Sequence, residues 1–229
     1  MENIILGRTG ANISRISLGT WSFGGANVSK NNQPVGWAGQ SEKDSQLALE
    51  KAHELGINHW DTADVYGNGV SEGIIGSMWQ KIQREKIFLA TKVGWDMGAY
   101  DHWYNPKQMK INMERSLLKL KVDHVDLMYL HHCNFGKKDE YFDDALNIIK
   151  KFQDEGKTRF IGLSDWSSSK IMNFLHRVDP DVIQPYRNVM DDTYETRCFS
   201  FMIKIRSLNN HVFIHGNISP NSIPKTFSS

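Results

Sequence analysis

The fold of this chain is decided by three short segments, INHWDT at residues 57–62, IFLATKV at 87–93 and VDLMYLH at 125–131. Each is a mainly apolar run with β-branched residues, which predicts a strand. Three further runs have the same character: ISLGTW (16–21), RFIGLS (159–164) and DVIQPY (181–186). Longer amphipathic stretches lie between the runs and predict helices over residues 40–55, 71–83, 106–120, 139–153 and 167–177. This alternation of strands and helices indicates parallel βα units.

Polar residues fall repeatedly at the ends of these strands. Four strands end at Asp61, Lys92, His131 and Ser164, and Gln184 lies in the sixth. Repeated βα units suit either a doubly wound sheet or a barrel, but a barrel gathers the carboxyl ends of many strands onto one rim. The sequence therefore predicts an α/β fold, a (β/α)8 TIM barrel that is incomplete, with about six recognisable βα units.

The segment GNGVSEG at residues 67–73 comes close to the glycine-rich fingerprint of a dinucleotide-binding doubly wound sheet. Its glycine spacing is one residue too long, and it follows a polar turn rather than a strand. We interpret it as a flexible loop that opens a helix, with Ser71 at the N-cap. Gly56 and Gly156 lie where two other helices are expected to end.

Composition limits the class of protein further. The 229 residues are 40% hydrophobic and 23% charged with a net charge of +1, which fits a globular domain and excludes a disordered chain. No apolar run reaches the roughly 18 residues of a membrane span, and the N-terminus lacks the layout of a signal peptide. Two cysteines, Cys133 and Cys198, give no disulfide framework. We expect a soluble, cytoplasmic protein with neither a membrane nor a nucleic-acid partner.

The segment DTADVYG at 61–67, followed by Ser71-Glu72, Thr91-Lys92 and DLMYLH at 126–131, resembles the aldo-keto reductase family. The resemblance covers approximately residues 3–195 and includes LGTW (18–21), IGLS (161–164) and QPYRN (184–188). It implies a (β/α)8 barrel that reduces carbonyls with NADPH and has no Rossmann domain. The catalytic tetrad of the family falls on Asp61, Tyr66, Lys92 and His131.

The chemistry of carbonyl reduction explains these four residue types. Hydride transfer to a carbonyl carbon builds negative charge on the oxygen, so an acid must deliver a proton there. Tyr66 is the candidate acid, and the Lys92 ammonium is expected to lower its pKa from about 10 by stabilising the phenolate. Asp61 would hold Lys92 charged and oriented, and His131 could hydrogen-bond the substrate oxygen.

The same resemblance implies a cofactor site and a substrate site. It places NADPH against Gly19, Thr20, Trp21, Asp61, Ser164, Asp165 and Gln184. The family more often has asparagine where this chain has Asp165, and an ionised carboxylate cannot donate a hydrogen bond to the nicotinamide amide. Asp165 and Ser164 could instead cap the next helix.

Tryptophans near the strand ends could wall the site of a small-molecule carbonyl. We assign Trp21 and Trp95 to the substrate, with Trp37 and Trp103 nearby, although aromatic residues are as often part of ordinary packing. The long polar segment at 24–40 could be a substrate loop or only a connection. Adjacent strand residues face opposite sides, so the run His131-His132-Cys133 does not predict a metal site.

The pattern changes near residue 195. All 26 acidic residues lie at or before Glu195, and only four scattered basic residues follow. A full barrel runs to about 250 residues, so the last two βα units are missing or unrecognisable, apart from one plausible strand at 211–215. We predict a barrel over 1–195, an atypical tail over 196–229, and a truncated or frame-shifted chain with weak stability and poor NADPH affinity.

These observations leave three hypotheses for function. The first is an NADPH-dependent oxidoreductase that reduces an aldehyde or ketone to an alcohol. The second is a non-catalytic cofactor-binding or regulatory barrel, and the third is an inactive truncated remnant. The sequence names neither the substrate nor the oligomeric state, and it does not decide between NADPH and NADH.

Overall fold

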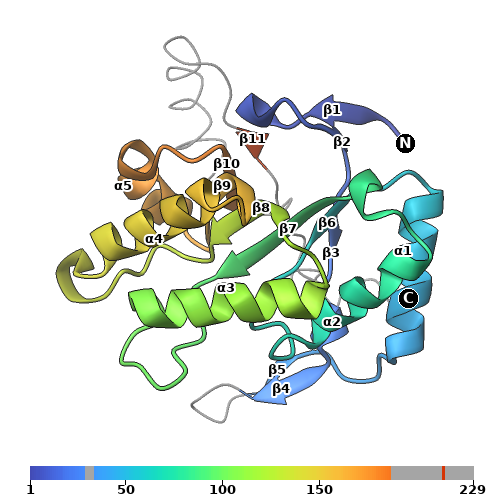
Figure 1. Cartoon of the computed structure of the whole chain (residues 1–229), viewed down its shortest axis with the longest axis horizontal. Coiled ribbons are helices and arrows are strands. Elements are labelled where there is room, and N and C mark those ends of the chain that lie inside the picture. The colour runs from blue at the N-terminus through green and yellow to red at the C-terminus, as the bar shows by residue number, and fades with distance from the viewer. Residues whose placement is uncertain (29–33, 187–212, 215–229) are drawn as a thin grey trace, which may run out of the picture.

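A computed structural model of the chain describes residues 1–28, 34–186 and 213–214. Its centre is a parallel sheet of seven strands in the order β11-β10-β9-β8-β7-β6-β3, which curls with the helices on its outer side (Figure 1). The strands are β3 (Leu18–Gly19), β6 (His59–Asp61), β7 (Phe88–Val93), β8 (Val125–Leu130), β9 (Thr158–Asp165), β10 (Val182–Pro185) and β11 (Phe213–Ile214). All six predicted strands are present, and they are parallel as predicted.

Within the described ranges, five α-helices alternate with the strands from β6 onward. They are α1 (Glu42–Glu54), α2 (Val70–Gly76), α3 (Pro106–Leu120), α4 (Phe142–Asp154) and α5 (Ser168–Val178). Short 3-10 helices connect the elements: η1 (Gly7–Thr9), η2 (Trp21–Gly24), η3 (Ser77–Gln80), η4 (Arg84–Lys86) and η5 (Lys137–Asp139). The helix predicted over 71–83 is therefore α2 followed by η3, and the other four lie close to the predicted ranges.

Local sequence sets the ends of several helices. The Asn105 side chain accepts a hydrogen bond from the Lys107 backbone N–H, and Pro106 occupies the first turn of α3. Gly56 and Gly156, with φ of +78° and +72°, follow the ends of α1 and α4 as predicted. The prediction for Ser71 was wrong, because α2 begins after Gly69 and the Ser71 hydroxyl bonds elsewhere.

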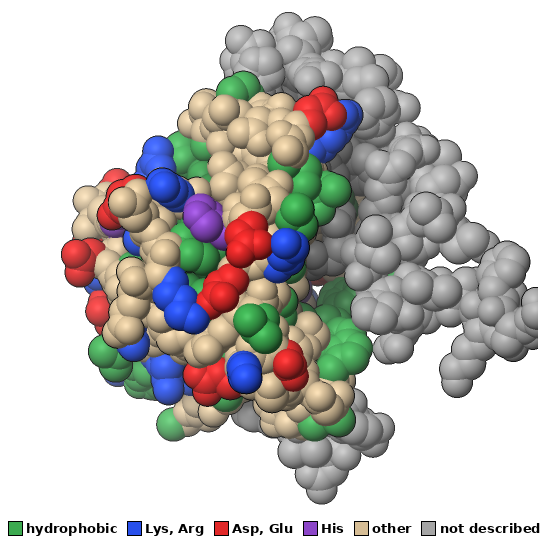
Figure 2. Space-filling view, turned by 90° about the vertical axis from the view of Figure 1, so that its right-hand side faces the viewer, with side chains coloured by type: hydrophobic (Ala, Val, Ile, Leu, Met, Phe, Trp, Pro, Cys, Tyr) green, Lys and Arg blue, Asp and Glu red, His purple; other side chains and the backbone are tan. Residues whose placement is uncertain are grey.

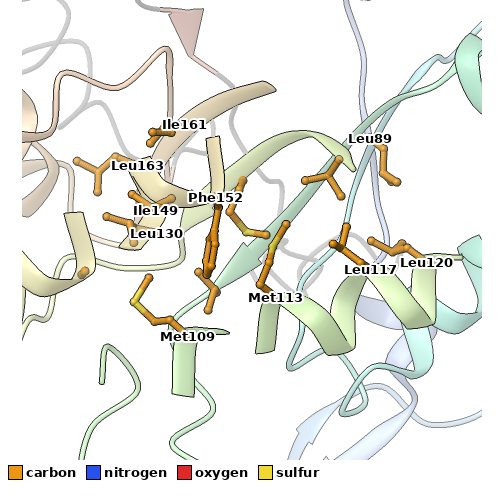
Figure 3. Packing of buried hydrophobic residues seen from close by; sticks show 14 of the residues in the cluster. Leu89, Met109, Met113, Leu117, Leu120, Leu130, Ile149, Phe152, Ile161 and Leu163 are labelled. Carbon is orange, nitrogen blue, oxygen red and sulfur yellow. The ribbon is translucent and has the colours of Figure 1, made fainter. Parts of the chain in front are cut away.

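The main hydrophobic core lies between the outer face of the sheet and the helices. Side chains alternate between the two faces of each strand, so Leu89, Leu130 and Leu163 point outward. Met109 and Met113 of α3 pack against this face, as Figure 3 shows, together with side chains from α4. This packing holds the strands in one register and thereby fixes the position of every inward-facing residue.

The inner face of the sheet is apolar at its amino-terminal end. A hairpin of β1 (Asn3–Ile5) and β2 (Asn12–Ser14) lies there, and its Leu6 and Ile13 pack against inward residues of the sheet. Those residues are Phe88, Ala90, Leu127, Tyr129 and Val182. The hairpin fills the bottom of the curled sheet, which leaves the carboxyl ends of the strands for polar groups.

Two predictions about less regular segments are modified by the structure. The segment at 24–40 is not a plain loop, because β4 (Ala26–Val28) and β5 (Pro34–Gly36) pair within it as an antiparallel hairpin. The strand predicted at 211–215 contains β11, which pairs in parallel with β10. The predicted domain boundary at 195 and nearly all of the predicted tail at 196–229 lie outside the described residues.

The surface carries charges of both signs. On the face shown in Figure 2, acidic and basic side chains are interspersed, in keeping with the net charge of +1. Within the described ranges, no helix is both long enough and apolar enough to cross a membrane. The described side chains also include no group of three or more His, Cys, Asp or Glu residues that could hold a metal ion.

Candidate active site

A cavity opens at the carboxyl ends of the strands. Its walls include one inward side chain from each of five consecutive units: Asp61, Lys92, His131, Ser164 and Gln184. Strand parity explains this convergence, since Lys92, His131 and Gln184 lie on the same face as the apolar residues two positions earlier, which are Ala90, Tyr129 and Val182. The cavity has a volume of about 200 Å³. Its other lining residues are Gly19, Thr20, Trp21, Ser22, Trp37, Tyr66, Asp165, Trp166, Pro185 and Tyr186.

Lys92 and Asp61 form an ion pair beneath the cavity. Each side chain is 1% exposed, and the Lys92 ammonium donates to Asp61 Oδ1 and, at 2.9 Å, to the carbonyl oxygen of Thr62. Burial disfavours the charged ammonium, but Asp61 and Tyr66 more than offset that effect and raise the pKa of Lys92. The lysine is therefore a fixed positive charge at neutral pH.

Tyr66 joins this pair through its hydroxyl group, because Lys92 Nζ lies 3.3 Å from Tyr66 Oη. The sequence predicts that Lys92 lowers the tyrosine pKa, and the structure corrects the net direction. Burial is the larger effect and raises the pKa of Tyr66, while Lys92 opposes it. In the ligand-free chain the phenol is therefore protonated at neutral pH, which is the form that a proton donor needs.

The Tyr66 turn is held by close backbone packing. A Cβ atom on Gly24 would lie 2.4 Å from the backbone nitrogen of Gly67, so only glycine fits there. Gly67 has φ of +61°, a conformation that L side chains rarely adopt. The Ser71 hydroxyl donates to the Thr20 backbone oxygen at 2.9 Å and so ties the start of α2 to the first strand's loop.

His131 is a half-buried neutral imidazole next to the tyrosine. Its ring lies edge-on to the Tyr66 ring at 5.9 Å between centroids. Burial, Lys92 and His132 together lower the pKa of His131 well below its ordinary value. A neutral ring has one N–H donor, and Nδ1 is buried without a hydrogen-bond partner among the described residues.

Ser164 and Gln184 extend the hydrogen-bond network to the next two strands. The Ser164 hydroxyl lies 3.2 Å from the backbone oxygen of Gln184 and 3.4 Å from its Oε1 atom. The Gln184 amide donates to Asp61 Oδ2 at 3.0 Å. One connected network thus joins five side chains: Ser164, Gln184, Asp61, Lys92 and Tyr66.

Asp165 lies at the edge of the cavity, but its carboxylate bonds to the backbone. Oδ1 accepts from the Ser167 N–H at 2.6 Å, and Oδ2 accepts from the Cys133 N–H at 2.7 Å. These bonds favour the alternative in which Asp165 caps the turn before α5. They also account for a carboxylate here, since both oxygens act as acceptors.

Aromatic rings form the upper wall of the cavity. Trp21 stacks on Tyr66 with 6.0 Å between the ring centroids. Trp37 packs edge-on against Trp21, with 4.4 Å between the ring centroids. Trp166 and Tyr186, which the sequence analysis missed, also line the cavity and lie 5.2 Å apart. Their position directly after the fifth and sixth strands is the signal that could have found them.

The structure does not place Trp95 in the cavity wall. Trp95 is 44% exposed and packs edge-on against His131 at 6.0 Å and His132 at 4.5 Å. Trp103 lies beside it and donates to the backbone oxygen of Asn134 at 3.0 Å. Of the four tryptophans considered for the substrate, Trp21 and Trp37 therefore line the cavity and the other two pack behind His131.

Comparison with known proteins identifies the class that this fold and site define. A model of the aldo/keto reductase family matches residues 15–220. The chain belongs to this family, as the sequence resemblance implies.

Individual relatives agree with this assignment. An L-galactose dehydrogenase of Arabidopsis thaliana is 31% identical over 79% of this chain and 54% of its own length. An NADH-specific methylglyoxal reductase of Escherichia coli is 29% identical over 85% of this chain and 61% of its own length. The chain thus spans about half to three fifths of these two relatives.

A solved structure of an aldo-keto reductase from Bacillus halodurans, in its holo form, supports the fold. It superposes with a TM-score of 0.76 at 24% identity, covering all of this chain and 72% of that one. Such structures are (β/α)8 barrels. The seven strands described here are therefore part of a barrel, which confirms the predicted fold class.

Proposed function

We propose that the chain is a nicotinamide-dependent oxidoreductase that reduces an aldehyde or ketone to an alcohol, with NADPH as the expected cofactor. One observation carries the proposal, namely the buried chain of contacts from Asp61 through Lys92 to the Tyr66 hydroxyl at the floor of a cavity. A purely structural ion pair between Asp61 and Lys92 would not explain why a phenol hydroxyl contacts the ammonium. Family membership supports the same reaction class.

The cavity residues fit a nicotinamide. Gln184 and Ser164 offer amide and hydroxyl groups that could hold its carboxamide, and aromatic rings from Trp166 and Tyr186 offer flat apolar surfaces. Gly19 and Thr20 lie on the other side of the cavity. A bound reduced nicotinamide would supply the hydride.

The residues of the chain would then manage the proton. Tyr66 donates its hydroxyl proton to the carbonyl oxygen as negative charge develops there, and the product is a neutral alcohol. The resulting phenolate is stabilised by the Lys92 ammonium, which Asp61 keeps in place. His131, neutral because of its lowered pKa, offers an N–H that could orient the carbonyl oxygen.

Replacement of Tyr66 by phenylalanine tests this proposal. The variant keeps the ring that stacks on Trp21 but lacks the acidic proton, so aldehyde-dependent NADPH oxidation should fall by about 100-fold or more. Tyr100→Phe, which removes a phenol outside the cavity, serves as the matched control. Turnover that survives in Tyr66→Phe at the wild-type rate would remove Tyr66 from the mechanism.

The same assay separates the other hypotheses. Cofactor binding without turnover by the wild-type chain would favour the non-catalytic barrel, and absence of both would favour the inactive remnant. Rates measured with NADPH and NADH in parallel decide the cofactor, which matters because one relative is NADH-specific. A small carbonyl compound is the proposed partner, and a cytoplasmic location stays a prediction.

A further inference from the structure

Gln184 makes a contact that its place in the sheet does not require. It lies on β10, and its amide donates to Asp61 Oδ2 on β6 at 3.0 Å. Three strands, β9, β8 and β7, separate β10 from β6 in the sheet. The hydrogen bond therefore crosses the concave inner face of the curled sheet. Both side chains are buried, with 3% and 1% exposure.

The bond fixes the orientation of the Asp61 carboxylate. Oδ1 faces the Lys92 ammonium, and Oδ2 faces the Gln184 amide. With both oxygens held, the carboxylate cannot rotate about its Cβ–Cγ bond without losing a buried hydrogen bond. Without Gln184, Oδ2 would be a buried acceptor that has lost this donor, which is unfavourable.

The remaining hydrogen-bonding capacity of Gln184 points into the site. A primary amide has two N–H donors and an oxygen with two lone pairs. Asp61 uses one N–H, and the Ser164 hydroxyl lies 3.4 Å from Oε1. One donor and one acceptor position are left on a side chain that lines the cavity, and they match the carboxamide of a nicotinamide, which has one acceptor oxygen and N–H donors.

We propose that Gln184 is a positioning residue for the proton donor: its buried bond across the sheet holds Asp61 so that Lys92 stays aimed at Tyr66. The inference rests on the proposed function for the role of Tyr66 as the proton donor. Its link to Asp61 rests on the geometry of the chain alone.

Removal of the Gln184 donor should change the pKa of Tyr66. If Asp61 loosens, Lys92 is less firmly held and stabilises the phenolate less. The charge of Asp61 itself raises the pKa of Tyr66, but the opposing effect of Lys92 is larger, so we expect ionisation of Tyr66 to become harder. The charged groups that act on the tyrosine are Lys92 and Asp61. The buried Asp64 carboxyl group also acts on it, and the neutral His131 ring faces it from the residue after β8. Loss of one hydrogen bond to a charged group corresponds to a shift of about one pH unit in the midpoint of that group itself. Tyr66 lies two contacts away from the lost bond, so its shift should be smaller.

The test compares Gln184→Met with Ser164→Ala. Methionine keeps the length of the side chain and removes both its donor and its acceptor, whereas Ser164→Ala alters the same subsite and leaves the bond to Asp61 in place. Phenolate absorbance is read in the ligand-free chain immediately after a pH jump. Subtraction of the same titration in the Tyr66→Phe background isolates the signal of Tyr66.

We expect the Tyr66 midpoint to rise in Gln184→Met and to stay unchanged in Ser164→Ala. Gln184→Asn, whose amide is too short to reach Asp61, should behave like Gln184→Met and provides a second variant if the first does not fold. Equal midpoints in wild type and in a folded Gln184 variant would overturn the proposal. Equal shifts in the Gln184 and Ser164 variants would overturn it as well, because they would indicate general loss of packing.

Steady-state turnover provides a second, independent test of the role of Gln184. At saturating cofactor, Gln184→Met should lower kcat and shift its pH profile, whereas Ser164→Ala should mainly raise the KM for cofactor. A wild-type chain that shows no turnover would contradict the proposed function, but the ligand-free titration would still decide the role of Gln184. A Gln184→Met variant with altered KM and an unchanged pH profile of kcat would limit this residue to cofactor binding.

Discussion

Asp64 is a carboxylic acid at a fully buried position, two residues before the candidate proton donor. Its side chain is fully buried, and the hydrogen-bond support for its carboxylate comes from the backbone N–H of Val65. Burial raises the pKa of Asp64 well above its ordinary value, Glu72 adds to the effect and Arg115 opposes it. The folded chain therefore holds this carboxyl protonated at a pH where the unfolded chain has lost the proton.

This difference predicts how stability depends on pH. The unfolded state releases the Asp64 proton near its ordinary pKa of 3.8, so stability is lost as the pH rises from there through the raised pKa of the folded state. Asp64→Asn has no proton to lose. Its free energy of unfolding, relative to wild type, should rise with pH by up to about 1.4 kcal/mol per unit within that window.

Urea unfolding of both chains between pH 5 and pH 8 measures this prediction. Asp123→Asn, which removes an exposed carboxylate, controls for the loss of one negative charge. A difference between Asp64→Asn and wild type that stays constant over this range would show that Asp64 is ionised in the folded chain.

At the residue scale, most of the candidate site could be predicted from the sequence, because the sequence pattern indicates where each strand ends and which residues share a face. Asp61, Lys92 and His131 end three strands, and the structure brings them together at one cavity. The net direction of the Tyr66 pKa could not be predicted, because burial depends on elements remote in the chain. Trp166 was missed because an aromatic residue after a strand resembles any loop residue.

Among the elements, η2 and the turn at 66–69 are coupled by backbone contact. A methyl group on Gly24 would lie 2.4 Å from the Gly67 nitrogen and 2.6 Å from the Tyr66 carbonyl carbon. Backbone atoms cannot move aside as a flexible side chain can. Any substitution at Gly24 must therefore displace the segment that carries Tyr66.

Gly24→Ala should consequently lower both stability and turnover. Overpacking of this kind costs about 1–3 kcal/mol, and a displaced phenol should reduce kcat by about 10-fold or more, since small misplacements of catalytic groups cost up to about 100-fold. Gly73→Ala in α2 is the control, because its Cβ would meet no other atom within 4 Å. Urea unfolding and the turnover assay check the pair, and equal kcat values would mean that the turn tolerates the methyl group.

Prediction of elements succeeded where the helix or strand pattern is long. The boundaries of α3 match the prediction at both ends, since Asn105 and Pro106 mark its start clearly. The β4–β5 hairpin was not predicted, because its strands are only three residues long and pair only with each other. The helix over 71–83 was predicted as one piece, although its second half is the 3-10 helix η3 and a turn.

For the whole molecule, the open sheet places the cavity between strands near its two ends. In the described ranges the sheet ends at β3 on one side and β11 on the other, and these two strands do not pair with each other. The cavity is lined by Gly19 of β3 and by Gln184 of β10, next to the other end. A nicotinamide seated there would contact strands from both sides of the sheet.

Cofactor binding is therefore expected to stabilise the entire fold rather than one loop. A ligand at 100 times its Kd adds about 2.7 kcal/mol to the free energy of unfolding. For a chain of this size that amount corresponds to a rise in Tm of roughly 5–10 °C. Thermal melts with NADPH and with NADH, each at that multiple of its own Kd, measure the shift, and AMP serves as a control ligand without a nicotinamide ring.

If the nicotinamide bridges the two sides, the dinucleotides should shift the whole cooperative transition, and AMP at the same concentration should shift it less. An equal shift with AMP would assign the stabilisation to the adenosine end and contradict a bridge between β3 and β10.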